Sequence, residues 1–325
     1  MTAGETDRGP TPLVVRGLTD VRSVREILWP AFEAGEGALP TLEYRQEVDM
    51  ARLRREVVEL TTEDRPDVLL VADPLAFDRE GLIEPVAAID PGPRPAAWVD
   101  AGERWVSIYA QPIVAIYNAR YRRPPRTWLD LADASWHRRL VFEAPVRMLT
   151  TGPALAELHA ALGSAAWEAW LSGLAASEAH QVADNERAVL EVATGARWAG
   201  LSNLNVARRV RPGSPVRHVF LDPTPCVPAF AIAVAGGRSP ALGQRFVRWL
   251  ASPDGQAAFG RTGRIAATDI APPDSAGASM IPKSVGRSAG TADWITDPDR
   301  WVAIYASVFP AEADHRAGKL RVDAR

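Results

Sequence analysis

The chain has 325 residues, which exceeds the usual size of a single hydrophobic core, so two domains or lobes are expected. Apolar residues make up 47% of it and charged residues 24%, as in ordinary globular proteins. The formal net charge of −3 argues against a basic surface for nucleic acid, so no nucleic-acid partner is expected. The single cysteine, Cys226, excludes an internal disulfide and a cysteine-based metal cluster. We expect it to be a small buried apolar residue.

No window of the sequence approaches the roughly 18 uncharged apolar residues of a membrane span, so no direct span is expected. The N-terminal stretch MTAGETDRGPTP has neither the basic nor the apolar region of a signal peptide. The compartment is therefore left open at this point. It is extracytoplasmic if a leader is missing from the chain, and cytoplasmic if Met1 is the true start.

The first part of the chain alternates between strand and helix patterns. The expected elements are a strand over 13–18, a helix over 21–32, a half-buried strand over 42–47, a helix over 50–60 and a fully buried strand over 67–73. This βαβαβ order predicts an open α/β sheet with right-handed crossovers. Ligands bind outside the carboxyl ends of such strands, so the candidates here are Thr19, Asp20, Ala72 and Asp73.

The rest of the chain continues the mixed pattern. The expected elements are a long strand over 107–118, a short helix within 124–142, helices over 153–162, 165–176 and 185–194, strands over 198–203 and 227–234, a helix over 239–251, a helix that starts at Ser252 and Pro253, and a closing helix that docks by Trp301, Ile304, Tyr305 and Val308. Within 124–142, Trp128 and Trp136 are expected to be buried, and Asp130 and Asp133 solvated.

Several short motifs occur in a characteristic order. A strand ending in Tyr117 and Asn118 is followed by Pro-x-x-Trp-x-Asp-Leu, Trp-x-x-Arg and a Thr-Gly helix start, and later by Phe-x-x-Trp-Leu and Ser-Pro-x-Gly-Gln. Over about residues 13–266 this series resembles the solute-binding proteins of bacterial ABC importers. The branch that it looks most like contains the ferric-iron and 2-aminoethylphosphonate binders with the type II periplasmic-binding fold.

This resemblance implies a two-lobed α/β protein in which each lobe is an open, mostly parallel sheet flanked by helices. Lobe 1 would comprise residues 1–113 and 227–325, and lobe 2 residues 114–226. Two crossing strands would act as the hinge for closure over the ligand. The implied partners are a small-molecule solute and an ABC permease, and the implied oligomeric state is a monomer.

One candidate anion site lies at the start of a helix in lobe 2. Thr150, Thr151 and Gly152 immediately precede Pro153, and free backbone N–H groups and two hydroxyls at a helix start favour an anion. Arg147 could add a bidentate bond to a phosphate, phosphonate or carboxylate. The alternatives are that one threonine only caps the helix and that Arg147 is a surface residue.

A second set of candidates consists of acids and amides. In the phosphonate-binding relatives an ammonium group needs acidic partners, so the resemblance implies that Asp20 and Asp73 would suit a zwitterion. The alternative is that they cap the helix and the turn that follow them. The resemblance implies two adjacent tyrosines behind strand 198–203 in ferric-binding members. This chain instead has Ser202, Asn203 and Asn205, which offer neutral hydrogen bonds or simply form a polar turn. Binding of Fe(III) is therefore less favoured.

The sequence contains none of the common catalytic motifs. Gly-x-Ser-x-Gly, His-Glu-x-x-His and a Walker loop are absent, and the five histidines are scattered. We therefore expect no catalytic residue, bound metal or cofactor. The preferred function is that of an ABC-importer solute-binding protein that closes over a small anionic or zwitterionic solute of the phosphonate, phosphate or carboxylate class. The alternative is a cytoplasmic biosynthetic enzyme or ligand sensor that reuses the same fold.

Overall fold

The computed structural model describes residues 11–47, 50–90, 92–121, 124–144, 151–270 and 297–309. These residues form two compact units, each with its own group of strands and helices. Unit 1 contains residues 11–110 and 228–270, and unit 2 contains 111–227 and 297–309, apart from the gaps just given. The expected α/β class is confirmed.

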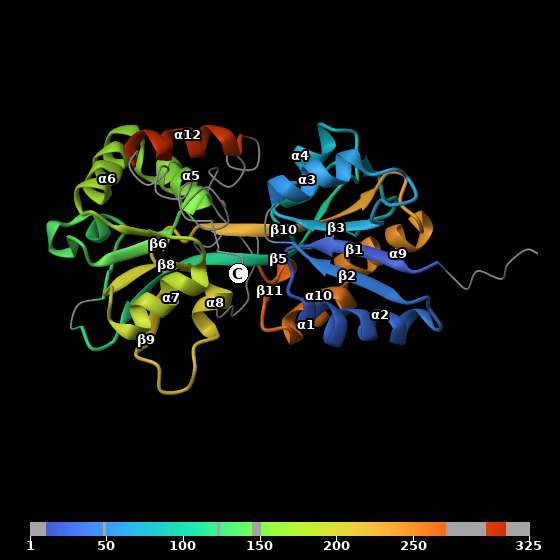
Figure 1. The fold of residues 1–325 in the computed structure, drawn as a ribbon, viewed down its shortest axis with the longest axis horizontal. Helices are drawn as coiled ribbons and strands as arrows, with labels where there is room; N and C mark the ends of the chain where they lie inside the picture. The colour runs from blue at the N-terminus through green and yellow to red at the C-terminus, as the bar shows by residue number, and fades with distance from the viewer. Residues whose placement is uncertain are drawn as a thin grey trace, which may run out of the picture. The chain divides into compact units, whose positions relative to one another are not determined.

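The elements follow one another in the expected alternation (Figure 1). The strands are β1 (Leu13–Gly17), β2 (Leu42–Gln46), β3 (Val68–Val71), β4 (Ile83–Glu84), β5 (Val106–Asn118), β6 (Leu140–Glu143), β7 (His180–Val182), β8 (Ala199–Asn203), β9 (Val216–Val219), β10 (Cys226–Val234) and β11 (Ile265–Ala266). The α-helices are α1 (Val21–Ser23), α2 (Trp29–Glu36), α3 (Met50–Glu59), α4 (Leu75–Asp78), α5 (Thr151–Leu162), α6 (Ser164–Ala176), α7 (Asn185–Thr194), α8 (Leu204–Arg208), α9 (Pro240–Ala251), α10 (Pro253–Arg261) and α12 (Pro298–Val308). Short 3₁₀ turns cover Ala96–Trp98, Leu129–Ala132, Ala134–Trp136 and Ala267–Asp269.

Unit 1 is built on three parallel strands in the order β2, β1, β3, and β10 runs antiparallel to β3. Helices cover both faces of this sheet, with α3 and α4 on one side and α1, α2 and α10 on the other (Figure 1). Every residue of β3 is therefore buried, as its continuous apolar run predicted. The aromatic part of the core joins Phe32 of α2 to Phe246 of α9, with 5.1 Å between their ring centroids.

The helix expected over 21–32 is interrupted by a wider turn. It starts at Val21, passes through a π-helical segment at Val24–Leu28 and continues as α2. Pro30 has no N–H to donate, and its ring would clash with the carbonyl one turn back in a regular helix. In the wider turn the N–H of Trp29 donates to the carbonyl of Val24. We attribute the π segment to this proline.

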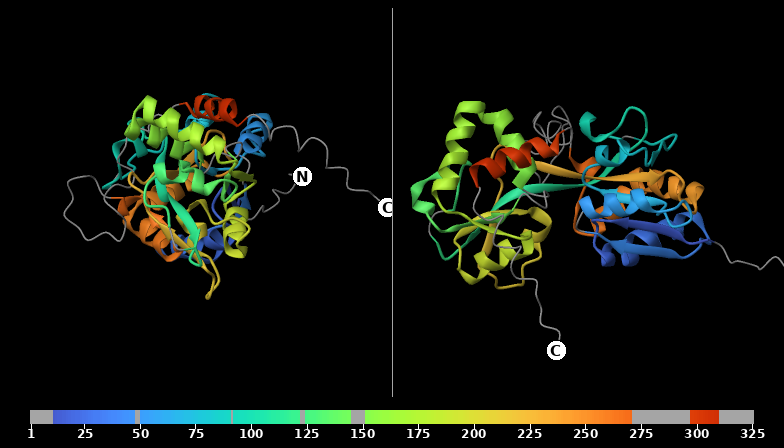
Figure 2. Two further views of the ribbon diagram at one scale, coloured as in Figure 1. Left: turned by 90° about the vertical axis from the view of Figure 1, so that its left-hand side faces the viewer. Right: turned by 45° about the horizontal axis from the view of Figure 1, so that its top comes forward.

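Unit 2 contains the parallel strands β7, β6 and β8, with β5 antiparallel to β8. Helices α5, α6 and α12 cover one face, and α7 and α8 cover the other (Figures 1 and 2). Gly200 permits the close approach of β8 to β6, because a Cβ atom there would lie 2.1 Å from the carbonyl oxygen of Val141. Trp128 and Trp136 are buried as predicted, Asp133 is exposed as predicted, and Asp130 is half-buried.

The placement of the C-terminal helix differs from the expectation. Residues 227–325 were assigned to lobe 1, but α12 packs against α5 and α6 and belongs to unit 2. Apolar spacing shows that a helix has a face to bury, but it does not show which surface receives that face. The expected crossing strands both contribute residues to the two units, β5 with its break after Ala110 and β10 with its break after Val227.

Candidate functional site

The ends of two neighbouring strands in unit 2 are joined by one asparagine. β6 and β8 are parallel partners, so Glu143 and Asn203, their last residues, lie at the same edge of the sheet. Asn185 donates from Nδ2 to Oε2 of Glu143 at 2.9 Å and accepts from the backbone N–H of Asn203 at 3.0 Å. All three side chains are buried. With Ser202 and Asn205 we call them the strand-end cluster.

Asn203 and Ser202 have local hydrogen bonds within the cluster. Oδ1 of Asn203 caps α8 by accepting from the N–H of Val206 at 3.0 Å. The hydroxyl of Ser202 is fully buried and donates to the carbonyl of Asn203 at 3.2 Å. For these two residues the polar-turn interpretation describes the geometry, and a contact with a ligand stays a prediction.

Asn205 is different, because its amide group is buried without a partner. Its side chain is only 7% exposed, and neither Nδ2 nor Oδ1 has a hydrogen-bond partner among the residues that the structure describes. A buried amide left in this state costs about 1–3 kcal/mol of stability. Such a group in a native fold calls for a hydrogen-bond partner that the described residues do not supply.

The predicted anion site at the start of α5 is only partly visible. The helix begins at Thr151, shortly after the end of β6, and Gly152 in its first turn is buried. Arg147 and Thr150 lie outside the described residues, and so does the side chain of Thr151. Anion binding by these residues therefore stays a prediction.

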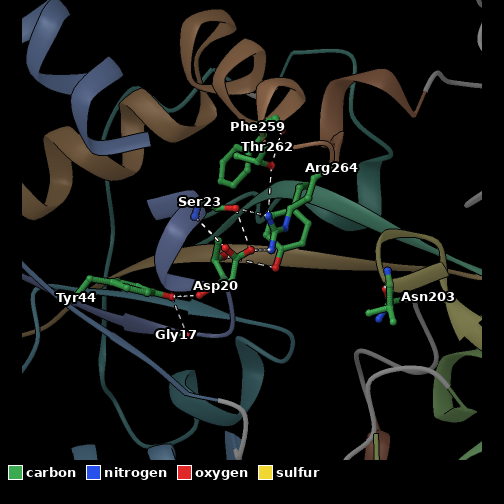
Figure 3. Close-up of polar contacts among 11 residues, drawn as sticks. Gly17, Asp20, Ser23, Tyr44, Asn203, Phe259, Thr262 and Arg264 are labelled. Atoms are coloured by element: carbon green, nitrogen blue, oxygen red, sulfur yellow. Dashed lines mark hydrogen bonds and ion pairs between the residues drawn. The ribbon is translucent and has the colours of Figure 1, made fainter. Parts of the chain in front are cut away.

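In unit 1, Asp20 caps a helix and also pairs with a distant arginine. Its carboxylate accepts from the N–H of Ser23 at 2.9 Å, from the hydroxyl of Ser23 at 2.9 Å and from Nη2 of Arg264 at 2.6 Å (Figure 3). Burial raises the pKa of Asp20, but the hydrogen bonds and charge of Arg264, together with Ser23, outweigh burial and hold it far below its usual range. The capping interpretation thus describes what Asp20 does in this structure.

Thr19 lies beside two tyrosines that the fold brings to the end of β1. Its side chain is fully buried, and its hydroxyl lies 3.5 Å from that of Tyr109. The hydroxyl of Tyr44 donates to the carbonyls of Gly17, at 2.9 Å, and Thr19 (Figure 3). Burial raises the pKa of Tyr44, so its phenol stays protonated.

Asp73 follows β3, the parallel neighbour of β1, so the two predicted acids stand at adjacent strand ends. Oδ1 of Asp73 accepts from the N–H of Ala76 at 3.2 Å, as expected for a cap of the turn at Pro74. Burial raises the pKa of this carboxyl. A contact between either acid and a ligand stays a prediction.

Sequence reasoning missed three residues of these clusters, namely Glu143, Asn185 and Arg264. Asn185 was identified only as the first residue of a helix, and Glu143 only as the end of a strand. Arg264 reaches Asp20 across 244 positions of the chain. One feature of the sequence could have indicated Glu143. It is a polar residue at the end of a predicted strand, and the ends of parallel strands lie at the same edge of a sheet.

Two searches of the structure concern metals and membranes. Within the described ranges, no three His, Cys, Asp or Glu side chains are grouped so that they could hold a metal ion. None of the described helices is long and apolar enough to cross a bilayer.

Comparison with solved structures identifies the fold. The chain is similar to iron-bound HitA from Pseudomonas aeruginosa, at TM-score 0.71 and 18% identity over 92% of this chain and 99% of that one. It is similar to the ferric binding protein from Campylobacter jejuni, at TM-score 0.71 and 16% identity over 91% and 99%. It is also similar to the periplasmic binding protein AfuA from Actinobacillus pleuropneumoniae, solved with fructose-6-phosphate, at TM-score 0.72 and 14% identity over 92% and 99%. At these identities the likeness shows the fold alone, which is the expected type II periplasmic-binding fold.

Sequence comparison identifies the family. No curated protein matches the chain. A family model described as bacterial extracellular solute-binding protein matches residues 19–264, which is well over half of the chain. The matched range includes the strand-end cluster and the Asp20–Arg264 pair, so both clusters belong to the family domain. The chain is therefore a member of the bacterial extracellular solute-binding protein family.

Proposed function

We propose that this protein is the solute-binding component of an ABC-type importer, and that it takes a small anionic or zwitterionic organic solute at the strand-end cluster of unit 2. The observation that carries the proposal is the buried amide of Asn205, which has no partner in the described part of the chain. A ligand that bonds to this amide would recover the cost of burying it. Family membership supplies the transport setting.

The chemistry of the cluster supports an organic ligand. The amide of Asn205 offers one acceptor and two donor hydrogens, so it can donate to a phosphate, phosphonate or carboxylate oxygen and accept from a hydroxyl or ammonium group. Ser202 lies three residues before Asn205, near the end of β8, and Asn205 lies in the helix α8 that follows. Because AfuA was solved with fructose-6-phosphate, sugar phosphates belong among the candidate solutes.

Fe(III) is the less favoured cargo. The resemblance implies adjacent tyrosines behind β8 in ferric-binding members, whereas residues 199–209 of this chain contain no tyrosine. An uncharged amide is a much weaker ligand for a hard trivalent cation than a phenolate oxygen. The similarity to ferric-binding proteins therefore supports the fold of this protein, but it does not support Fe(III) as its ligand.

Titration calorimetry tests the proposal. The purified protein is titrated with 2-aminoethylphosphonate, inorganic phosphate, fructose-6-phosphate, succinate and ferric citrate. We expect at least one organic solute to bind at 1:1 stoichiometry and to lose about tenfold or more in affinity in Asn205→Ala, since one hydrogen bond in a buried site contributes about 1.5 kcal/mol. Leu190→Ala, at an exposed position of α7, is the control and should bind as the parent does. Binding of ferric ion alone, or unchanged affinity in Asn205→Ala, would contradict the proposal.

The importer part is tested separately in cells. Deletion of the gene should abolish uptake of the radiolabelled solute identified by calorimetry, and the parent gene should restore uptake. Normal uptake in the deletion strain would show that the protein binds this solute for another purpose.

A further inference from the structure

The helix α12 lies outside the range matched by the family model, yet it is firmly packed. It starts at Pro298 after Asp297, whose Oδ1 accepts from the N–H of Arg300 at 3.2 Å. Trp301 and Tyr305 are one turn apart on the same side of the helix and are 1% and 3% exposed. A helix with a buried aromatic face therefore lies beyond the range that the family model matches.

The aromatic face of α12 contacts three elements of unit 2. The indole of Trp301 meets the ring of Trp167 in α6 at 6.1 Å and 79°, and the ring of His159 in α5 at 5.5 Å. Phe309, just after the helix, stacks on Tyr305 at 4.4 Å and meets Phe142 of β6 edge-on at 6.3 Å. Figures 1 and 2 both show α12 lying along α5 and α6. We call this set of contacts the aromatic seam.

The seam ends next to the residues of the proposed solute site. Phe142 immediately precedes Glu143, which Asn185 ties to Asn203 in the strand-end cluster. Helix α5 meets Trp301 through His159 in its last turn, and its opposite end begins with the Thr151 and Gly152 segment of the predicted anion site. In a close-packed interior, a shift at one contact moves the neighbouring side chains as well. Edge-on aromatic pairs also favour one relative orientation of the two rings.

We propose that α12 is a positioning element for the solute site, holding the end of β6 in place through Phe309 and fixing helix α5 at its last turn through Trp301. The inference rests on the proposed function as far as the solute is concerned. No side chain of α12 needs to touch the solute, because the helix acts through Phe142 and α5.

Hydrogen exchange measured by mass spectrometry tests this coupling without any solute. In Phe309→Ala we expect faster amide exchange over residues 140–143, and in Trp301→Ala we expect faster exchange of the hydrogen-bonded amides of α5. Ser307→Ala is the matched control, since Ser307 is an exposed residue of the same helix whose hydroxyl donates only to the carbonyl of Ile304. It should exchange as the parent does. Phe309→Ala keeps the test decisive if Trp301→Ala does not fold.

Calorimetry with the solute found for the parent protein then measures the consequence. We expect Phe309→Ala to weaken binding by about tenfold, within the range of couplings carried through packed side chains, and Ser307→Ala to leave it unchanged. Unchanged exchange at residues 140–143 and in α5 overturns the inference even if the parent binds a solute. Faster exchange in a protein that binds none of the organic solutes supports the coupling and counts against the proposed function instead.

Discussion

Asn205 is the residue on which the proposed solute site rests. A native fold seldom buries an amide without a partner, because the group loses its bonds to water and gains none in return. Departures of this kind from good packing tend to occur at functional sites. An apolar side chain of similar size would remove the cost and, with it, the capacity to bind a polar ligand.

We therefore expect Asn205→Leu to raise the free energy of unfolding by about 1 kcal/mol while it lowers solute affinity. Urea denaturation measures the first quantity and calorimetry the second. The opposite signs of the two changes distinguish a ligand-binding amide from a structural one.

Asn118→Leu is the control for that substitution. Asn118 is also buried in unit 2, but its Nδ2 donates to the carbonyl of Val192 at 2.8 Å and its Oδ1 accepts from the N–H of Arg120 at 3.0 Å. The loss of these bonds should lower the free energy of unfolding by about 2 kcal/mol. Equal losses in the two variants would mean that the amide of Asn205 is satisfied in the native protein.

The Asp20–Arg264 pair predicts a pH dependence of stability. The folded protein holds the pKa of Asp20 well below its ordinary value of 3.8. A carboxyl with a depressed folded pKa stabilises the protein above its unfolded pKa, and this contribution is lost as the pH falls. Asp20→Asn should lower the free energy of unfolding by about 2 kcal/mol at pH 7, and it should flatten the decline below about pH 4.

Glu26→Gln is the comparison for that experiment. Glu26 pairs with Arg22 at 2.9 Å on the same helix, but both side chains are mostly exposed. Such a pair contributes about 0–1 kcal/mol, so the variant should change stability little at any pH. A decline in acid that is identical in the parent and in Asp20→Asn would show that other carboxyls cause it.

At the scale of elements, two Ser-Pro helix starts provide a direct test of capping. The hydroxyl of Ser252 accepts from the N–H of Gly255 at 3.3 Å at the start of α10, whereas Ser239 makes no side-chain cap for α9. Ser252→Ala should lower the free energy of unfolding by about 1 kcal/mol and Ser239→Ala by only a few tenths. Thermal or urea unfolding of both variants checks the difference. A larger loss in Ser239→Ala would contradict the assignment.

The most accurately predicted elements are those whose first and last residues are set by capping residues next to them in the sequence. Helix α7 was expected over 185–194 and occupies that range, because Asp184 caps its start and Gly195, at φ 81°, ends it in the left-handed region. The helix from Val21 was expected to be regular, and the wider turn before Pro30 was missed. Apolar spacing predicts that a helix exists, but it does not show how the backbone passes a proline.

At the scale of the whole molecule, Cys226 reports how well β10 is protected from solvent. β10 is a strand with residues in both units. The thiol is buried, and burial raises its pKa well above the ordinary value. A thiol reagent should therefore react with the native protein only at the rate at which unfolding exposes Cys226. It should react with the urea-unfolded protein at once. Rapid labelling of native protein in a simple thiol assay would contradict this burial.

The sequence by itself determined the α/β class, the order of strands and helices, the two strands shared by the units, and a family that residues 19–264 match. These features follow from spacing, caps and motifs, which are local. The tertiary structure alone decided that Arg264 pairs with Asp20, that Asn185 joins Glu143 to Asn203, and that α12 packs in unit 2. A charge or an apolar face shows that a partner is needed, but only the folded chain brings residues far apart in sequence within 3 Å of each other.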